Sequence, residues 1–324
     1  SPTNIQPSGK LVVPQYELLE LAIDLSDIVI SEEVLDYLNY QGSDYTNYPG
    51  LNPYNPEDVS FEFQFLEDGV DYTIYGFFTR DYHYKDVQGN IVTSNSTNVS
   101  DWEITNNSEK FIVRFAPQKC GTLFPVITLR YRNQNSNSIE SVLLNLPFDE
   151  IEVIKNDKVS EAVINWNQSR GAFISKDRSS NSTVEFIPLG INAIWTSHYF
   201  PNVDKGRSDH LLQNHSLMSE YIDAGASLFR IPMSNWSYNF EYERLNNYSD
   251  RLNVAQELDK LFRIAEQNNV KIQLDIEHGT ITDAGGCEQG WLKKPSGEHY
   301  SQWDYSPYNT YGVSGSDIHC KSSA

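Results

Sequence analysis

Arg230 stands in the middle of an apolar run, Ser227-Leu228-Phe229-Arg230-Ile231-Pro232-Met233. A guanidinium in such surroundings is costly unless it meets a carboxylate, so the sequence predicts an acidic partner for Arg230. The alternative is an arginine at the rim of the segment that pairs locally. Two more polar residues follow or end apolar runs, Asn192 and His278. His278 could donate a hydrogen bond to a bound molecule or be a loop histidine without a role.

Two carboxylates precede His278 closely. Asp275 and Glu277 are two residues apart, so on a strand their side chains point to the same side. Alternation adds Gln273 to this face, and we expect a polar face directed toward a helix or loop rather than an acid/base pair. The sequence has no Gly-rich phosphate loop, no metal-spaced His/Cys cluster and no Ser-His-Asp arrangement. It therefore predicts neither a metal site nor a cofactor.

Three apolar runs alternate with two helical patterns in the second half of the chain. This order predicts right-handed βαβ units and a parallel sheet covered by helices. Ligands of a β/α barrel bind at the carboxyl ends of its strands, where Asn192, Trp195, Arg230 and His278 would lie. The expected strands are near 186–191, 227–232 and 270–276, and the expected helices span 208–224 and 254–268.

The two helical patterns carry start, stop and packing signals. Gly225 follows the first pattern at the position of a C′ glycine. Candidate N-caps are Ser208 or Asp209 for the first helix and Asp250 or Asn253 for the second. The residues expected to face inward are Leu211, Met218 and Ile222 in the first helix and Val254, Leu258, Leu261 and Ala265 in the second.

The stretch from Phe186 to Ala324 is shorter than the roughly 250 residues of a closed eight-stranded barrel. We therefore expect residues 186–324 to form the first part of an incomplete TIM (β/α)8 barrel. Such a sheet has an open edge, which exposes backbone and apolar surface. A C-terminal segment missing from this chain, or a protein partner, is expected to cover that edge.

Residues 11–155 have a different periodicity. Apolar and polar residues alternate in several segments, as at Phe61, Phe63 and Phe65, and turn residues separate these segments. About seven to nine strands are expected, with a β pattern throughout from Tyr16 to about Glu152, which is typical of an antiparallel immunoglobulin-like β-sandwich. Residues 1–10 are expected to be a flexible leader and residues 156–185 a linker. The fold class predicted for the chain is multidomain β plus α/β.

The composition excludes several classes of partner. The chain has 44 Asp and Glu against 24 Lys and Arg, a net charge of −20, which disfavours nucleic acid and anionic membranes. No apolar stretch reaches 18 residues, so no membrane insertion is expected. The chain begins Ser1-Pro2 and carries no signal peptide, as expected of a processed or trimmed protein.

The cysteine spacing leaves two arrangements open. A disulfide between Cys287 and Cys320 and three unpaired thiols, including Cys120, are equally compatible with it. Eight Asn-X-Ser/Thr sequons are present, at a frequency that an Asn- and Ser-rich chain produces by chance.

Residues 186–278 resemble the opening of the clan-A-type glycoside hydrolases, the (β/α)8 family that includes cellulases and mannanases. The resemblance rests on Gly190-Ile191-Asn192 with Trp195, on Phe229-Arg230-Ile231 and on the third strand that closes at His278. Residues 301–312 resemble the loop before the third barrel helix. The preceding sandwich resembles the immunoglobulin-like domain of such enzymes at residues 52–56, 75–78 and 112–115.

The resemblance implies a retaining mechanism with an acid/base Glu on strand four and a nucleophile Glu on strand seven. Neither strand is in this chain, so no catalytic residue is assigned and the chain alone is not expected to hydrolyse glycosides. Arg230 corresponds to the arginine that holds the nucleophile, and His278 to a subsite histidine. The substrate-binding residues expected for a polysaccharide or oligosaccharide are Asn192, Trp195, Arg230, Trp236 and His278, with Trp291 and Trp303 as further candidates on a long loop.

The function that follows is the N-terminal portion of a secreted or cell-surface glycoside hydrolase-like protein acting on β-linked polysaccharide. One alternative is a catalytically inactive glycan-binding or assembly component of a bacterial surface complex. Another is that the sandwich is a spacer and nothing in the chain contacts sugar, and Trp195 would then pack between sandwich and barrel.

Overall fold

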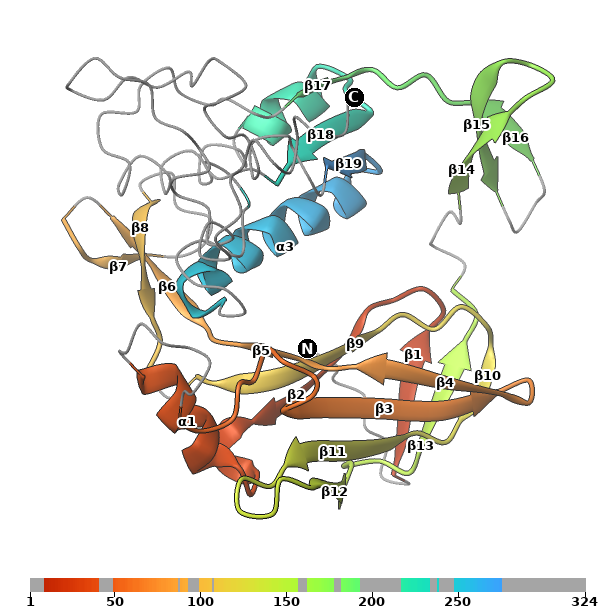
Figure 1. The fold of residues 1–324 in the computed structure, drawn as a ribbon. Coiled ribbons are helices and arrows are strands. Elements are labelled where there is room, and N and C mark those ends of the chain that lie inside the picture. The colour runs from red at the N-terminus through yellow and green to blue at the C-terminus, as the bar shows by residue number, and fades with distance from the viewer. Residues whose placement is uncertain are drawn as a thin grey trace, which may run out of the picture. The chain divides into compact units, whose positions relative to one another are not determined.

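The computed structural model describes residues 9–40, 49–86, 88–92, 99–106, 108–156, 162–177, 182–192, 217–233, 238 and 248–275 (Figure 1). The chain divides into two compact units. The first consists of Ser1–Asp81 and Asn106–Phe186, and the second of Tyr82–Thr105 and Ile187–Ala324. Within the described ranges, no helix is long and apolar enough to cross a membrane.

The first unit contains most of the described strands, arranged in four small sheets. The first sheet has the order β1 (Lys10–Pro14), β13 (Glu150–Ile154), β10 (Gly121–Leu123). The second has the order β12 (Ile139–Leu144), β11 (Val126–Arg132), β3 (Val59–Glu67), β4 (Val70–Tyr75). The third has the order β2 (Leu19–Asp24), β9 (Lys110–Phe115), β5 (Phe77–Thr79).

The alternation of the sequence produces the core of this unit. Phe61 and Phe63 of β3 are fully buried, and Phe61 stacks on Phe111 of β9 with 4.3 Å between ring centroids. Ile127 and Leu129 of β11 are buried beside them. The inward positions expected from the period-2 pattern are therefore confirmed for β3, β9 and β11, because every second residue of these strands enters the core.

Two features of the first unit differ from the expected pattern, in which every element is a strand and every pairing is antiparallel. β1 and β13 pair in parallel, with Lys10 opposite Glu150. Residues 25–39 form a 3-10 turn, η1 (Leu25–Asp27), and a helix, α1 (Ser31–Asn39), which buries Val34 and Tyr37 three residues apart on one face. The expectation of strands alone between Tyr16 and Glu152 is therefore wrong at this point. The immunoglobulin-like assignment itself stays a prediction.

The stretch expected to be a linker forms a small antiparallel sheet. Its strands are β14 (Ala162–Asn167), β15 (Ala172–Asp177) and β16 (Thr183–Glu185), with β15 in the centre. Trp166 and Phe173 are cross-strand partners in a T-shaped contact at 5.1 Å. This aromatic pair stabilises the hairpin, as cross-strand pairs do in antiparallel sheets.

The second unit contains the parallel sheet expected from residues 186–276. Its strands are β17 (Gly190–Asn192), β18 (Leu228–Pro232) and β19 (Lys271–Asp275), in that order, and both pairings are parallel. The first strand is shorter than expected. Pro188 lacks an amide hydrogen, and Ile187 and Leu189 are exposed, so regular pairing starts only at Gly190. Closure into a barrel stays a prediction.

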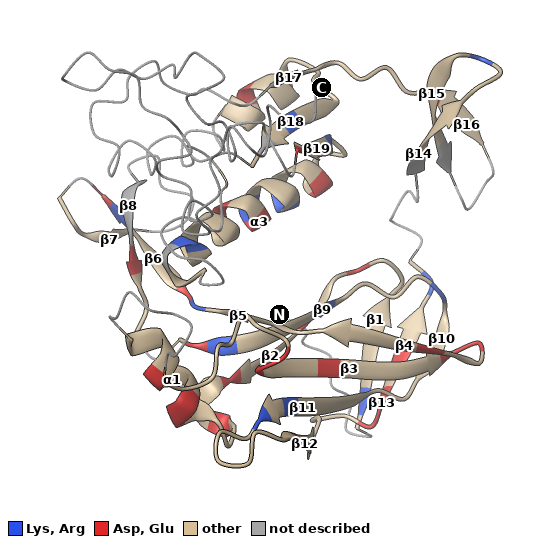
Figure 2. Cartoon of the chain, in the orientation of Figure 1, with Lys and Arg blue, Asp and Glu red and all other residues tan. Residues whose placement is uncertain are grey.

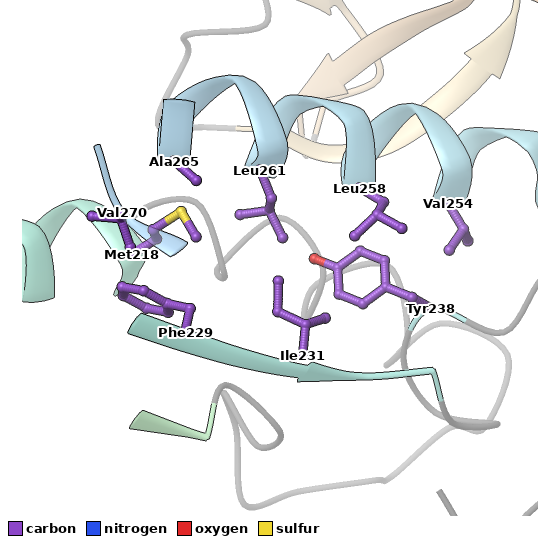
Figure 3. Close-up of a cluster of buried hydrophobic side chains, with 9 residues drawn as sticks. All are labelled: Met218, Phe229, Ile231, Tyr238, Val254, Leu258, Leu261, Ala265 and Val270. Carbon is purple, nitrogen blue, oxygen red and sulfur yellow. The ribbon is translucent and has the colours of Figure 1, made fainter. Parts of the chain in front are cut away.

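One helix covers one face of this sheet. Helix α3 (Leu252–Gln267) buries Val254, Leu258, Leu261 and Ala265, which confirms the inward stripe. Figure 3 shows these side chains above Phe229 and Ile231 of β18. Its N-cap is Arg251, without a side-chain cap hydrogen bond, and the 3-10 turn η3 (Ser249–Arg251) precedes it, so capping by Asp250 or Asn253 is wrong.

The segment before β18 follows the expected helix in part. Residues 217–223 are helical, Met218 is buried, and Ile222 packs against the same core. Gly225 has a φ of +91° and ends this helix, as its C′ position requires. Ser208, Asp209 and Leu211 lie outside the described residues.

The second unit also includes a segment from the middle of the β region. We call residues 82–105 the arm, which contains β6 (Tyr82–Asp86), β7 (Ile91–Val92) and β8 (Val99–Ile104), ordered β7-β6-β8. Tyr84 of β6 is 6% exposed, and Gln256 of α3 donates a hydrogen bond from Nε2 to its hydroxyl at 3.4 Å. The compact units meet between Phe186 and Ile187, but residues 156–185 fall in the first unit and the arm falls in the second.

The buried hydroxyl of Tyr84 is expected to make the second unit sensitive to alkali. Burial, followed by the charge and hydrogen bond of Glu257, raises the pKa of Tyr84. The unfolded chain ionises this tyrosine near its ordinary pKa of about 10, whereas the folded chain does not. The contribution of Tyr84 to stability is thus complete below about pH 10 and is lost as the pH rises further.

Urea unfolding between about pH 8 and pH 11 measures this effect. The midpoint of the second unit should fall less steeply with pH in a Tyr84→Phe variant than in the parent chain. Equal slopes would show that Tyr84 titrates like an exposed tyrosine.

Candidate functional site

The parallel sheet of the second unit has one apolar and one polar face. Phe229 and Ile231 of β18 enter the core under α3 (Figure 3), so Arg230 between them lies on the opposite face. On β19, Ile272 and Leu274 pack against the same core. Gln273 and Asp275 alternate with them and therefore share the face of Arg230.

Arg230 forms an ion pair with Asp275 on this polar face. The contact joins Arg230 Nη2 and Asp275 Oδ2, and the side chains are 36% and 14% exposed. Arg230 is opposite Gln273 and Pro232 is opposite Asp275, so the Arg230 side chain reaches two register positions toward the carboxyl ends of the strands. The predicted acidic partner of Arg230 therefore exists on the adjacent strand, and the pair is local.

This geometry narrows the expected direction of the polar face, which was toward a helix or a loop. Gln273 and Asp275 do share one face, as alternation predicts, but α3 packs on the other face. The polar face is thus not the one that meets this helix. Asp275 pairs with Arg230, and Glu277 lies outside the described residues.

Asn192 is aligned with Arg230 in the backbone register. Asn192 of β17 is the partner of Arg230, and Arg230 is the partner of Gln273, so the three form one row across the sheet. The structure thereby brings together two of the five expected binding residues. The others, Trp195, Trp236 and His278, lie outside the described residues, as do Trp291 and Trp303.

Two residues that sequence reasoning did not select hold the first strand in place. The Ser227 hydroxyl donates to the carbonyl oxygen of Ile187 at 2.9 Å and accepts from the amide of Leu189 at 3.0 Å. Gly190 lies so close to β18 that a Cβ would overlap the carbonyl oxygen of Leu228. The Gly-Ile-Asn sequence was a signal for Gly190, because glycine in a strand often marks a close backbone approach.

The polar face offers hydrogen-bonding groups and an ion pair of zero net charge. Such a surface can bind the hydroxyl groups of a neutral ligand, since a guanidinium donates and a carboxylate accepts. In the part of the chain that the structure describes, no three His, Cys, Asp or Glu side chains are grouped closely enough to hold a metal ion. Cys120 is exposed and free, and Cys287 and Cys320 lie outside the described residues.

Comparison with known proteins gives a weak structural likeness. No protein-family model and no curated protein matches the sequence. A solved structure from Bacteroides vulgatus ATCC 8482, described as a candidate glycoside hydrolase, is similar at a TM-score of 0.42 and 13% sequence identity. The likeness covers 81% of this chain and 40% of the other.

Proposed function

We propose that the chain is the N-terminal portion of a secreted or cell-surface glycoside hydrolase-like protein that acts on β-linked polysaccharide. The observation that carries this proposal is the Arg230–Asp275 ion pair on the polar face of a parallel sheet. In β/α barrels, ligands bind at the carboxyl ends of the strands, and both residues lie toward these ends. The resemblance of residues 186–278 to clan-A-type glycoside hydrolases supports the same assignment.

A neutral glycan fits the charge of the chain. The net charge of −20 repels anionic polysaccharides, and α1 and β3 carry acidic positions, coloured red in Figure 2. The sugar hydroxyls would bind to Arg230 and Asn192, while Trp195 and Trp236 would supply rings that stack on apolar sugar faces. His278 completes the proposed set.

The roles of the two charged residues differ in this proposal. Asp275 fixes the guanidinium of Arg230, since an ion pair between neighbouring strands restricts both side chains. Arg230 then presents fixed N–H donors, which would orient the nucleophile carboxylate of a retaining enzyme. The acid/base and nucleophile residues would come from barrel strands four and seven, which are not among the strands that the structure describes.

Binding of soluble polysaccharides by the 324-residue chain tests the proposal. We expect affinity electrophoresis to show retardation in gels that contain β-linked glucan or mannan and none with an α-linked glucan. Arg230→Gln should weaken the binding about tenfold, the effect of losing a hydrogen bond to a charged group. The matched control is Lys271→Gln, which removes a positive charge from the amino end of β19, where Lys271 Nζ donates a hydrogen bond to Asn269 Oδ1 at 3.1 Å.

Equal retardation by α- and β-linked glycans, or equal effects of the two substitutions, would contradict the proposal. A complete absence of binding would favour the alternative in which the sandwich is a spacer.

A catalytically inactive glycan-binding or assembly component is the second candidate. It is favoured by the position of Asp275, because Arg230 has an acidic partner without any nucleophile from another strand. A protein that carries this chain together with all remaining barrel strands separates the two candidates. The inactive component would bind β-linked glycans but would not turn over aryl β-glycosides.

A further inference from the structure

Helix α3 makes contacts on two sides. Its apolar stripe packs on the parallel sheet through Leu258 and Leu261. Gln256 and Lys260 lie about half a turn away from this stripe, given 3.6 residues per turn, and both contact Tyr84 of the arm. Within the second unit, α3 therefore lies between the sheet and the arm.

The contact between the arm and α3 joins the buried Tyr84 to polar groups of α3 that are partly or fully buried. The Tyr84 ring is 6% exposed, and Lys260 Nζ lies 5.1 Å from its centroid in a cation–π contact. Its hydroxyl accepts from Gln256 and is hydrogen-bonded to Glu257. Burial lowers the pKa of Lys260, which shows that this ammonium has lost part of its hydration.

The burial of Glu257 explains why the side of α3 that carries Gln256, Glu257 and Lys260 must pack against another segment. Glu257 is 0% exposed, although a Glu side chain on a helix normally reaches water. A buried carboxylate is stable only when it is hydrogen-bonded or paired, and Tyr84 is a donor that the arm supplies. Without the arm, the flank formed by Gln256, Glu257 and Lys260 would lose this partner.

We propose that the arm is the resident partner of the Gln256–Lys260 flank of α3 and that the second unit needs it in order to fold. The arm lies in the sequence between β5 and β9 of the first unit, yet it belongs to the second unit and contacts α3 there. Residues 187–324 by themselves therefore do not form an autonomous unit.

Hydrogen exchange of the backbone amides, measured on the whole chain, tests this proposal. In Tyr84→Ala, the amides of α3 and β18 should exchange roughly tenfold faster than in the parent, because loss of a buried packing and hydrogen-bonding partner makes local opening easier. Tyr84→Phe keeps the ring and should have a smaller effect. Amides of β3 and β11 in the first unit serve as an internal reference and should not change.

Two further variants complete the design. Tyr75→Ala removes a tyrosine that is 61% exposed on β4, so α3 should exchange at the parent rate. Replacement of residues 82–105 by a short Gly-Ser turn should abolish protection of α3 and leave β3 and β11 protected. Protection of α3 equal to the parent in both Tyr84→Ala and the arm deletion would overturn the proposal.

Discussion

Gly190→Ala is expected to unfold the parallel sheet of the second unit. A Cβ at this position would overlap the carbonyl oxygen of Leu228 and would lie 2.6 Å from its carbonyl carbon. Both atoms belong to the backbone of the adjacent strand, so no side-chain rotation relieves the contact. Relief requires separation of β17 from β18, and the expected cost is about 3 kcal/mol or more.

The measurement is amide exchange of β17, β18 and β19 during urea unfolding of the whole chain. Gly171→Ala is the matched control, because Gly171 has a φ of +63° and no atom within 4 Å of the added Cβ. It should cost only about 1 kcal/mol of backbone strain. If Gly190→Ala were no more destabilising than this control, β17 would not approach β18 as closely as the structure shows.

The second large effect concerns turnover in a protein that joins this chain to all remaining barrel strands. Arg230→Ala should lower kcat roughly 100-fold or more and raise KM only about tenfold, because the proposed role of Arg230 in orienting a nucleophile carboxylate affects turnover more than its hydrogen bond to the sugar affects binding. Trp236→Ala should do the reverse and mainly raise KM. Initial rates on an aryl β-glycoside across a range of concentrations give both constants.

Asp275→Asn provides the control for this experiment. It keeps the shape of the Asp275 side chain but removes the charge that holds Arg230, so its effect on kcat should lie between those of the parent and Arg230→Ala. Unchanged turnover in Arg230→Ala would show that Arg230 is a structural residue of the sheet and that the proposed site is misplaced.

Periodicity predicted those helices and strands whose buried positions depend only on the sequence of the segment itself. The stripe of α3 and the apolar positions of β18 and β19 follow from spacing alone, because one face of the helix and one face of each strand meet the core. Gly225 was predictable for the same reason, since the αL position at a helix end favours glycine. Alternation also placed Gln273 and Asp275 on one face.

Contacts between distant segments were not predictable from these patterns. The parallel pairing of β1 with β13 depends on which strands meet, and alternation along either strand is the same for both directions. Arg230 signalled that a carboxylate partner exists, but its identity depends on the register of β18 with β19. The burial of Glu257 and Tyr84 depends on the docking of the arm, which leaves no periodic trace in α3.

The position of the arm also determines when the second unit can be completed during synthesis. Gln256 follows Tyr84 by 172 residues. At roughly 5–20 residues per second, a ribosome needs about 10–30 s to extend the chain from the arm to its docking site on α3. Within that interval the ribosome completes the strands of the first unit up to β13, while the helix that Tyr84 covers has not yet been made. The arm therefore emerges early and docks late, and the closing step of folding belongs to a segment made in the first third of the chain.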